Sequence, residues 1–135
     1  GGGAGGSGPC KTAQLDFSTS EGAAAGNLLV HMKNTGSASC TLRGFPGVDL
    51  NGEAGSFNAD RSNAAPQTVS VQPGEATSFT LNYTPNDSGG SGTDVTSLVV
   101  TPPNETQSQT VPVSINLPVT DSPTPGVTVD PVGVG

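Results

Sequence analysis

The chain has 135 residues, among them 20 Gly and 12 Pro, and only 31% of its residues are hydrophobic. This length favours one domain, and the composition predicts a thin core, which excludes a helical bundle or a large enzyme fold. The net charge of −7 leaves no basic face, so we expect no binding to nucleic acid or to anionic lipid. No apolar run approaches the ~20 residues that a membrane-spanning helix requires.

The N-terminal segment 1–9, GGGAGGSGP, has no side chain that can pack, so we expect a flexible Gly-rich tether there. The alternative is a remnant of expression or the ragged end of a mature protein. Residues 10–135 are expected to form a single β-sandwich domain. We recognise no signal peptide, and an exported protein is then expected to be in its mature or trimmed form.

The chain contains two cysteines, Cys10 and Cys40. They could be a free pair in a reducing cytosol or a disulfide in an oxidising compartment. Small domains with thin cores commonly need a covalent link, so the composition favours the disulfide. In the chain-entropy model such a bridge contributes about 3.5 kcal/mol to stability.

In the first half of the chain, apolar residues recur with a period of two, which predicts β-strands. The alternating positions are Leu15 and Phe17, then Leu28, Val30 and Met32, then Cys40 and Leu42, then Val48 and Leu50. Turns are expected at residues 34–37 and 44–47. Asn51-Gly52 is the strongest short hairpin signal, because both residues tolerate positive φ.

The second half continues with the same period. Its alternating positions are Val69 and Val71, then Phe79, Leu81 and Tyr83, then residues 95–101, then Val111, Val113, Ile115 and Leu117, then Val127 and Val129. Pro73-Gly74 is expected to form a turn, and Pro102-Pro103 to end a strand. Pro112 cannot donate to a sheet, so its strand should be an edge strand or contain a bulge.

Eight or so short strands separated by Gly, Pro and Asn turns, with no helical periodicity over three turns, are typical of an antiparallel sandwich. We therefore predict an all-β protein, an immunoglobulin-like antiparallel β-sandwich with one disulfide. The core Trp of antibody domains is absent, so the likeness concerns architecture and not ancestry.

Residues 34–50, NTGSASCTLRGFPGVDL, resemble a family of exported or lipoprotein domains of actinobacteria whose function is unknown. Weaker similarities follow at residues 71–76 (VQPGEA) and 99–103 (VVTPP), and Cys10 matches the first cysteine of the family. The resemblance covers roughly residues 10–132 and implies an extracellular or envelope setting, with a Gly/Ser-rich spacer and room for a lipid anchor upstream. It implies no catalytic residues, and the second cysteine pair of many members is missing here.

Side chains suited to catalysis or metal binding are few. His31 is the one histidine; it lies on the polar phase of its strand with no neighbouring ligand cluster, so we expect neither a metal site nor a Ser-His-Asp triad. The loop of residues 86–94 offers oxygen ligands for calcium, with a plain solvated loop as the alternative. Phe45, Phe57 and Tyr83 could stack on a sugar, or serve as core and edge residues.

We therefore expect a non-enzymatic, monomeric binding domain without cofactors, secreted or tethered to an actinobacterial envelope, whose partner is an extracellular protein or a cell-wall polymer. One alternative is a secreted protease inhibitor whose loop at residues 60–66 (DRSNAAP) enters an enzyme cleft. Another is a carrier of small ligands. The candidate interaction residues are Asp60, Arg61, Ser62 and Asn63.

Overall fold

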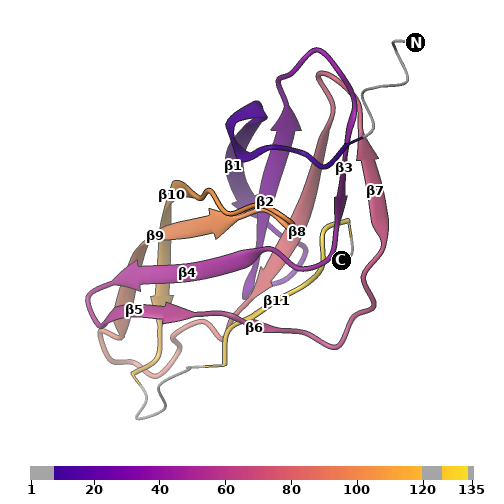
Figure 1. Ribbon diagram of the computed structural model, residues 1–135. Coiled ribbons are helices and arrows are strands. Elements are labelled where there is room, and N and C mark those ends of the chain that lie inside the picture. Colours follow the sequence, from indigo (N-terminus) through magenta and orange to yellow (C-terminus); the bar gives the residue numbers. More distant parts are fainter. Residues whose placement is uncertain (1–7, 120–125, 134–135) are drawn as a thin grey trace.

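The computed structural model describes residues 8–119 and 126–133. In this part of the chain a short 3₁₀ turn, η2 (Thr12–Gln14), precedes the strands β1 (Leu15–Glu21), β2 (Asn27–Asn34), β3 (Cys40–Arg43), β4 (Gly47–Gly52), β5 (Gly55–Asn58), β6 (Asp60–Arg61), β7 (Thr68–Val71), β8 (Ala76–Asn82), β9 (Thr93–Thr101), β10 (Gln109–Leu117) and β11 (Thr128–Val129) (Figure 1). The protein is all-β, as predicted, and its expected strands are present.

Three sheets build the sandwich: a five-stranded sheet in the order β1-β2-β8-β11-β6, a four-stranded sheet in the order β10-β9-β4-β5, and the pair β3-β7. In Figure 1, β4 and β5 run across the direction of β2 and β8. The alternation of apolar and polar residues lets each strand bury one face. The buried side chains of all three sheets form one core. Its largest fully buried side chains include Met32, Phe79 and Leu81 from the first sheet, Leu50 and Leu98 from the second, and Leu42 and Val71 from the third. The arrangement is consistent with an immunoglobulin-like sandwich.

The N-terminal end of the described chain is fixed to β3. Cys10 and Cys40 form the expected disulfide, with 4.8 Å between their Cα atoms, and both side chains are buried. The Cys10 amide also donates to the Thr41 carbonyl oxygen at 2.9 Å, and Thr41 donates back to Gly8 at 2.9 Å. The predicted tether, residues 1–9, lies outside the described residues except for Gly8 and Pro9.

The hairpin at residues 51–52 is present, but the prediction of its turn was wrong. Gly52 pairs with Gly55 inside the ladder, and the turn lies on the two residues between them. A Cβ atom at Gly52 would overlap the carbonyl oxygen of Asp94, so this glycine permits close approach of β4 to β9. The register of β4 against β9 also shifts between Asn51 and Gly52, which marks a bulge.

Pro112 lies where a residue without an N–H donor is tolerated. Its strand, β10, is at the end of the four-stranded sheet, and the register against β9 shifts between Pro112 and Ile115. The sequence left an edge strand and a bulge as alternatives, and the structure has both.

The chain turns a corner between β3 and β4, where it passes from the two-stranded to the four-stranded sheet. Gly44 adopts a φ of 108°, a region that favours glycine, and Pro46 is buried behind it. The carbonyl oxygen of Gly44 accepts a hydrogen bond from the Val132 amide at 3.0 Å, so the segment after β11 supports the corner. Phe45 stands between these two residues and remains half-buried. This corner is the foundation of the candidate site.

Candidate functional site

A solvent-open hollow of about 380 Å³ lies beside the β3–β4 corner. Arg43 and Arg61 supply its positive charge, while Phe45, Pro66 and Pro103 supply apolar surface. These residues come from the end of β3, the corner, β6, the loop after β6 and the turn after β9. The hollow therefore combines cations and apolar walls from segments far apart in the sequence, as binding sites commonly do.

Arg61 lies across the ring of Phe45. The carbon at the centre of its guanidinium is 5.2 Å from the ring centroid, which is within the range of a cation–π contact. The backbone on either side is fixed, because the amides of Asp60 and Ser62 donate to the carbonyl oxygens of Val127 and Val129 at 2.9 and 3.0 Å. Arg61 is thus an exposed cation held over an aromatic face by a short paired strand.

Arg43 is positioned from the other side of the corner. Its Nη1 atom donates to the Thr68 hydroxyl oxygen at 3.0 Å, across the β3–β7 pair in which these two residues are partners. A guanidinium has five N–H donors in a planar fork, so this bond leaves donors for a ligand. The hydroxyl of Thr68 sets the direction of the side chain without neutralising its charge.

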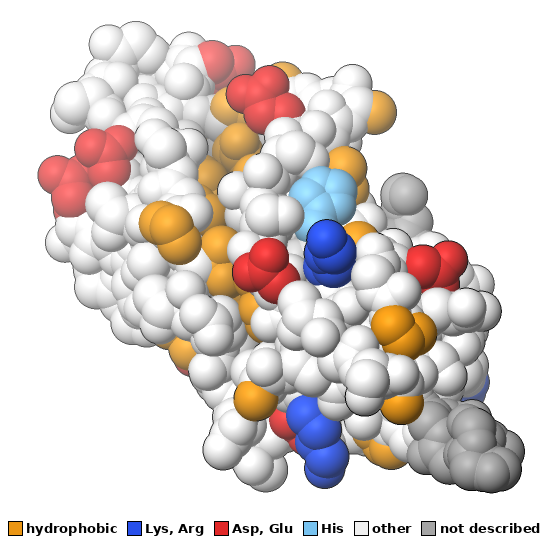
Figure 2. Space-filling model, turned by 90° about the horizontal axis from the view of Figure 1, so that it is seen from above, with side chains coloured by type: hydrophobic (Ala, Val, Ile, Leu, Met, Phe, Trp, Pro, Cys, Tyr) orange, Lys and Arg blue, Asp and Glu red, His pale blue; other side chains and the backbone are white. Residues whose placement is uncertain are grey.

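Two of the four basic residues of a chain with net charge −7 line this one hollow. The face in Figure 2 consists mostly of uncharged side chains and backbone, with a few acidic and basic side chains spread over it. The hollow is thus lined by two cations and by no carboxylate, which suits it to pair with an anionic group.

Of the four predicted interaction residues, only Arg61 lines the hollow. The prediction that residues 60–66 form a loop was wrong for Asp60 and Arg61, which form β6 and pair in parallel with β11. Ser62 is half-buried, and its hydroxyl oxygen accepts a hydrogen bond from the Ala64 amide at 3.3 Å. Asn63 is exposed in the loop that follows.

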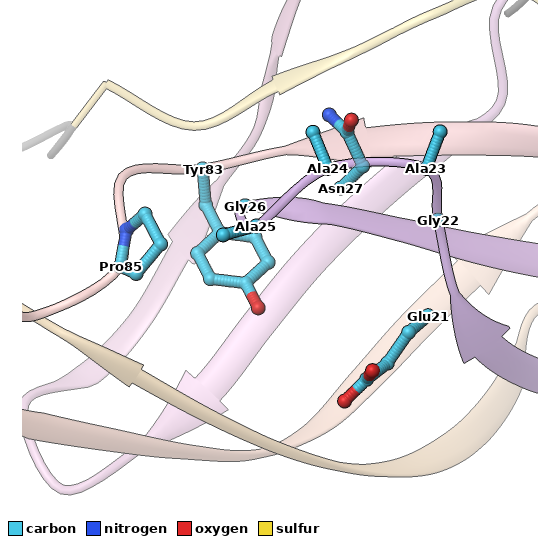
Figure 3. Close-up of a pocket in the computed structure, with 9 residues that line it drawn as sticks. All are labelled: Glu21, Gly22, Ala23, Ala24, Ala25, Gly26, Asn27, Tyr83 and Pro85. Carbon is cyan, nitrogen blue, oxygen red and sulfur yellow. The ribbon is translucent and has the colours of Figure 1, made fainter.

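A second hollow, of about 410 Å³, opens at the loop between β1 and β2 (Figure 3). Its wall is made of the small residues 22–26, with the Tyr83 ring below them, Pro85 beside the ring and the Glu21 carboxylate farther off. The Tyr83 amide donates to the Gly26 carbonyl oxygen at 2.8 Å, which holds the loop against the end of β8. Glu21 and Tyr83 supply the only ionisable side chains among its lining residues, so this hollow has few groups for catalysis or for binding a charged ligand.

His31 is paired with a neighbour on the next strand. Its Nε2 atom lies 2.6 Å from the Ser20 hydroxyl oxygen, and the two residues are on β2 and β1. Among residues 8–119 and 126–133, no group of three or more His, Cys, Asp or Glu side chains could hold a metal ion. The arrangement around His31 is a cross-strand hydrogen bond on a sheet face.

Two of the side chains weighed as calcium ligands, Asn86 and Asp94, accept hydrogen bonds from other protein groups. The amide oxygen of Asn86 accepts from the backbone and hydroxyl of Ser88 at 3.2 and 2.6 Å. The Asp94 carboxylate accepts from the side chain of Asn116 at 2.7 Å, and Asp94 itself belongs to β9. The side chain of Asn116 on β10 also accepts from the Asn86 amide nitrogen at 2.8 Å and donates to the Ser91 carbonyl oxygen at 3.0 Å, which fastens the loop to β10.

Residues 10–133 match the family model described as "Domain of unknown function (DUF4232)". Since the match spans nearly the whole chain, the protein belongs to this family. No curated protein and no solved structure matches the chain. Within the described residues, no helix has the length and apolar character to cross a membrane.

Arg43 lines the hollow but was not among the predicted interaction residues. It lies in the stretch 34–50 that resembles the exported domains, where the turns, Cys40 and Phe45 were the features interpreted. The low number of basic residues could have drawn attention to Arg43, because in a chain with four Lys and Arg two cations at one place suggest a site for an anionic group. Their meeting point could not be read from spacing, since it depends on β6 pairing with the C-terminal strand β11.

Proposed function

We propose that this protein is a non-enzymatic, monomeric binding domain, secreted by or tethered to the envelope of an actinobacterium. Its binding surface is the hollow of Arg43, Phe45 and Arg61. The observation that carries the proposal is the gathering of two positioned guanidiniums and an aromatic ring in one open hollow of an otherwise acidic chain. Arginine and aromatic side chains are enriched where proteins bind each other.

Three features support an exported setting. Disulfides persist in oxidising compartments, and the Cys10–Cys40 bridge joins the start of the domain to β3. The Gly-rich segment 1–9 has the composition of a flexible spacer. The stretch at residues 34–50 resembles exported actinobacterial domains. A domain at the end of a spacer can present the hollow to a partner outside the cell.

Binding rather than catalysis is favoured by the chemistry of the side chains. General acid–base catalysis usually needs a group tuned toward neutral pH by burial or neighbours. His31 sits on a sheet face beside Ser20, and the hollow at the corner is lined by two arginines and by no histidine or carboxylate. A positioned cation needs no such tuning to recognise a partner.

The test measures binding of the labelled chain to isolated actinobacterial envelopes and to secreted proteins, for the wild type, Arg61→Ala and the control Lys33→Ala. Lys33 is exposed on β2, so its replacement changes the net charge equally without touching the hollow. We expect saturable binding that Arg61→Ala weakens and Lys33→Ala leaves unchanged. Equal binding by all three proteins would overturn the proposal.

The same preparations test the non-enzymatic part and the protease-inhibitor alternative. The chain should not turn over any substrate in panels for esterases, proteases and glycosidases. Turnover that persists after purification of the chain would contradict the proposal. The chain is also added to secreted proteases. One-to-one inhibition that is lost in Arg61→Ala would favour the inhibitor alternative, with Arg61 in its contact surface.

A further inference from the structure

We propose that the hollow at the β3–β4 corner binds an acidic peptide segment, in which carboxylates are flanked by an apolar or aromatic side chain. This inference rests on the proposed function and names the class of its partner. The carboxylates would pair with Arg43 and Arg61, and the apolar side chain would lie against Phe45, Pro66 and Pro103.

The two guanidiniums are positioned before any ligand arrives. Arg61 rests on the Phe45 ring, and Arg43 is held by the Thr68 hydroxyl. Each contact restricts a long side chain but leaves N–H donors of the guanidinium for bidentate pairing with a carboxylate. The entropy of ordering these side chains is thereby partly lost already on folding, which favours binding.

The apolar part of the lining distinguishes a peptide from a purely ionic polymer. Both prolines line the hollow, Pro66 exposed and Pro103 largely buried. Neither has a backbone N–H, so they offer carbon atoms and no donor to a phosphate. A polyol phosphate of a cell wall would leave this surface and the Phe45 ring unused. An acidic peptide with an apolar side chain would use the cations and the apolar walls together.

The turn after β9 supplies a polar group suited to a peptide backbone. Asn104 lines the hollow and has a φ of 64°, a conformation that asparagine tolerates better than most residues. The turn is closed by a hydrogen bond from the Glu105 amide to the Pro102 carbonyl oxygen at 3.1 Å. An exposed side-chain amide on a closed turn can both donate to and accept from a peptide group.

The experiment uses the full chain and three probes: the blocked peptide Ac-AADFDA-NH₂, its neutral counterpart Ac-AANFNA-NH₂, and poly(glycerol phosphate). Binding is followed by titration of the ¹⁵N-labelled protein, recording backbone amides and arginine side-chain resonances. We expect the acidic peptide to shift the resonances of Phe45, Arg61 and Asn104 in one saturable step. The neutral peptide should bind at least about fivefold more weakly, because it lacks the charges that pair with arginine.

Variants locate the interaction. Arg61→Ala and Arg43→Ala are each expected to weaken binding of the acidic peptide by about fivefold, whereas Lys33→Ala, with the same change in charge, should not. Both arginines are exposed, so these proteins should retain the wild-type circular dichroism spectrum. Arg61→Lys should bind more weakly than the wild type, since an ammonium group offers no planar fork.

Equal affinity for the acidic and neutral peptides, or equal loss in Lys33→Ala, would overturn the proposal. Binding of poly(glycerol phosphate) alone, with shifts at the same residues, would assign the hollow to a polymer instead. If no probe binds but Arg61→Ala still loses its envelope or secreted partner, the peptide class fails while the proposed function stands. If that partner binding is also unaffected, both fail.

Discussion

The side-chain amide of Asn34 donates to the backbone carbonyl oxygen of Val71 at 3.0 Å, and thereby joins the end of β2 to the end of β7. The same nitrogen donates to the Ala38 carbonyl oxygen at 2.9 Å, and the side-chain oxygen accepts from the Gly36 amide at 2.8 Å and from the Gln14 side chain at 3.3 Å. Asn34 is fully buried, and all of its side-chain hydrogen-bonding capacity is used. A buried residue with this many partners fixes the turn that follows β2.

Replacing Asn34 should therefore destabilise the domain strongly. We expect Asn34→Ala to lower the free energy of unfolding by about 2–3 kcal/mol, because buried backbone groups lose their partners. Asn34→Asp should cost more near neutral pH, since it places a carboxylate against two carbonyl oxygens. Urea unfolding measures both, with Asn63→Ala, an exposed residue, as the control. A loss in Asn34→Ala no greater than in the control would contradict the assigned role.

The disulfide should account for a large share of the stability. We expect the double variant Cys10→Ala/Cys40→Ala to unfold about 3 kcal/mol more easily, because the cross-link restricts the unfolded chain. Intact mass under denaturing alkylation checks the bond directly. The chain should gain no alkyl groups without reductant and two after reduction, and a gain of two without reductant would show that the thiols are free.

Two glycines of β4 provide a matched pair of substitutions. A Cβ at Gly52 would overlap backbone atoms of β9, whereas one at Gly47 would lie 3.7 Å from the Thr101 side chain, an ordinary contact. We expect Gly52→Ala to destabilise the fold by about 1–3 kcal/mol through overpacking, and Gly47→Ala to have little effect. The melting temperatures of the two variants and the wild type, compared by thermal unfolding, test this difference. Similar losses in both would mean that β4 and β9 are not held so closely.

The carboxylate of Glu105 should make stability depend on pH. A hydrogen bond from the Thr12 backbone amide, at 2.8 Å, lowers the pKa of Glu105 below its ordinary value of 4.5. A carboxylate with a lowered pKa in the folded state contributes stability that is fully present above the unfolded value and is lost as pH falls through the folded value. The loss is therefore expected below pH 4.5.

Glu105→Gln tests this relationship, because it keeps an acceptor for the Thr12 amide but cannot titrate. The free energy of unfolding, measured with urea from pH 6 down to pH 3, should fall less steeply for Glu105→Gln than for the wild type. If both proteins show the same pH dependence, the ionised form of Glu105 does not stabilise the link between η2 and the turn after β9.

Strands that bury one face could be predicted because their sequence must alternate. β2 shows this well: Val30 and Met32 are fully buried, while Lys33 on the other phase is exposed. β5 and β6 were missed because their sequences do not alternate between apolar and polar residues. β5 reads GSFN, with Phe57 as its one large apolar side chain, and β6 is a pair of exposed polar residues whose pairing with β11 gives no signal in the sequence.

The candidate site was only half predictable. Arg61 stands out in a chain with few cations, and Phe45 in a stretch rich in Gly and Pro. Their contact depends on the path of the backbone through the corner and on the position of β6, which are set by tertiary packing. The turn at Asn51-Gly52 was misassigned because a local preference for positive φ was outweighed by the approach of β9 to Gly52.

The position of β11 bears on how the molecule folds. This strand lies between β8 and β6, so residues 128–129 must be inserted between partners that end near residues 82 and 60. Pairing across such long stretches of chain is slow, because the entropy of loop closure is lost before the contacts form. During synthesis the five-stranded sheet cannot be completed until β11 emerges. A chain arrested before residue 126 would leave the sides of β6 and β8 that β11 covers open to other strands.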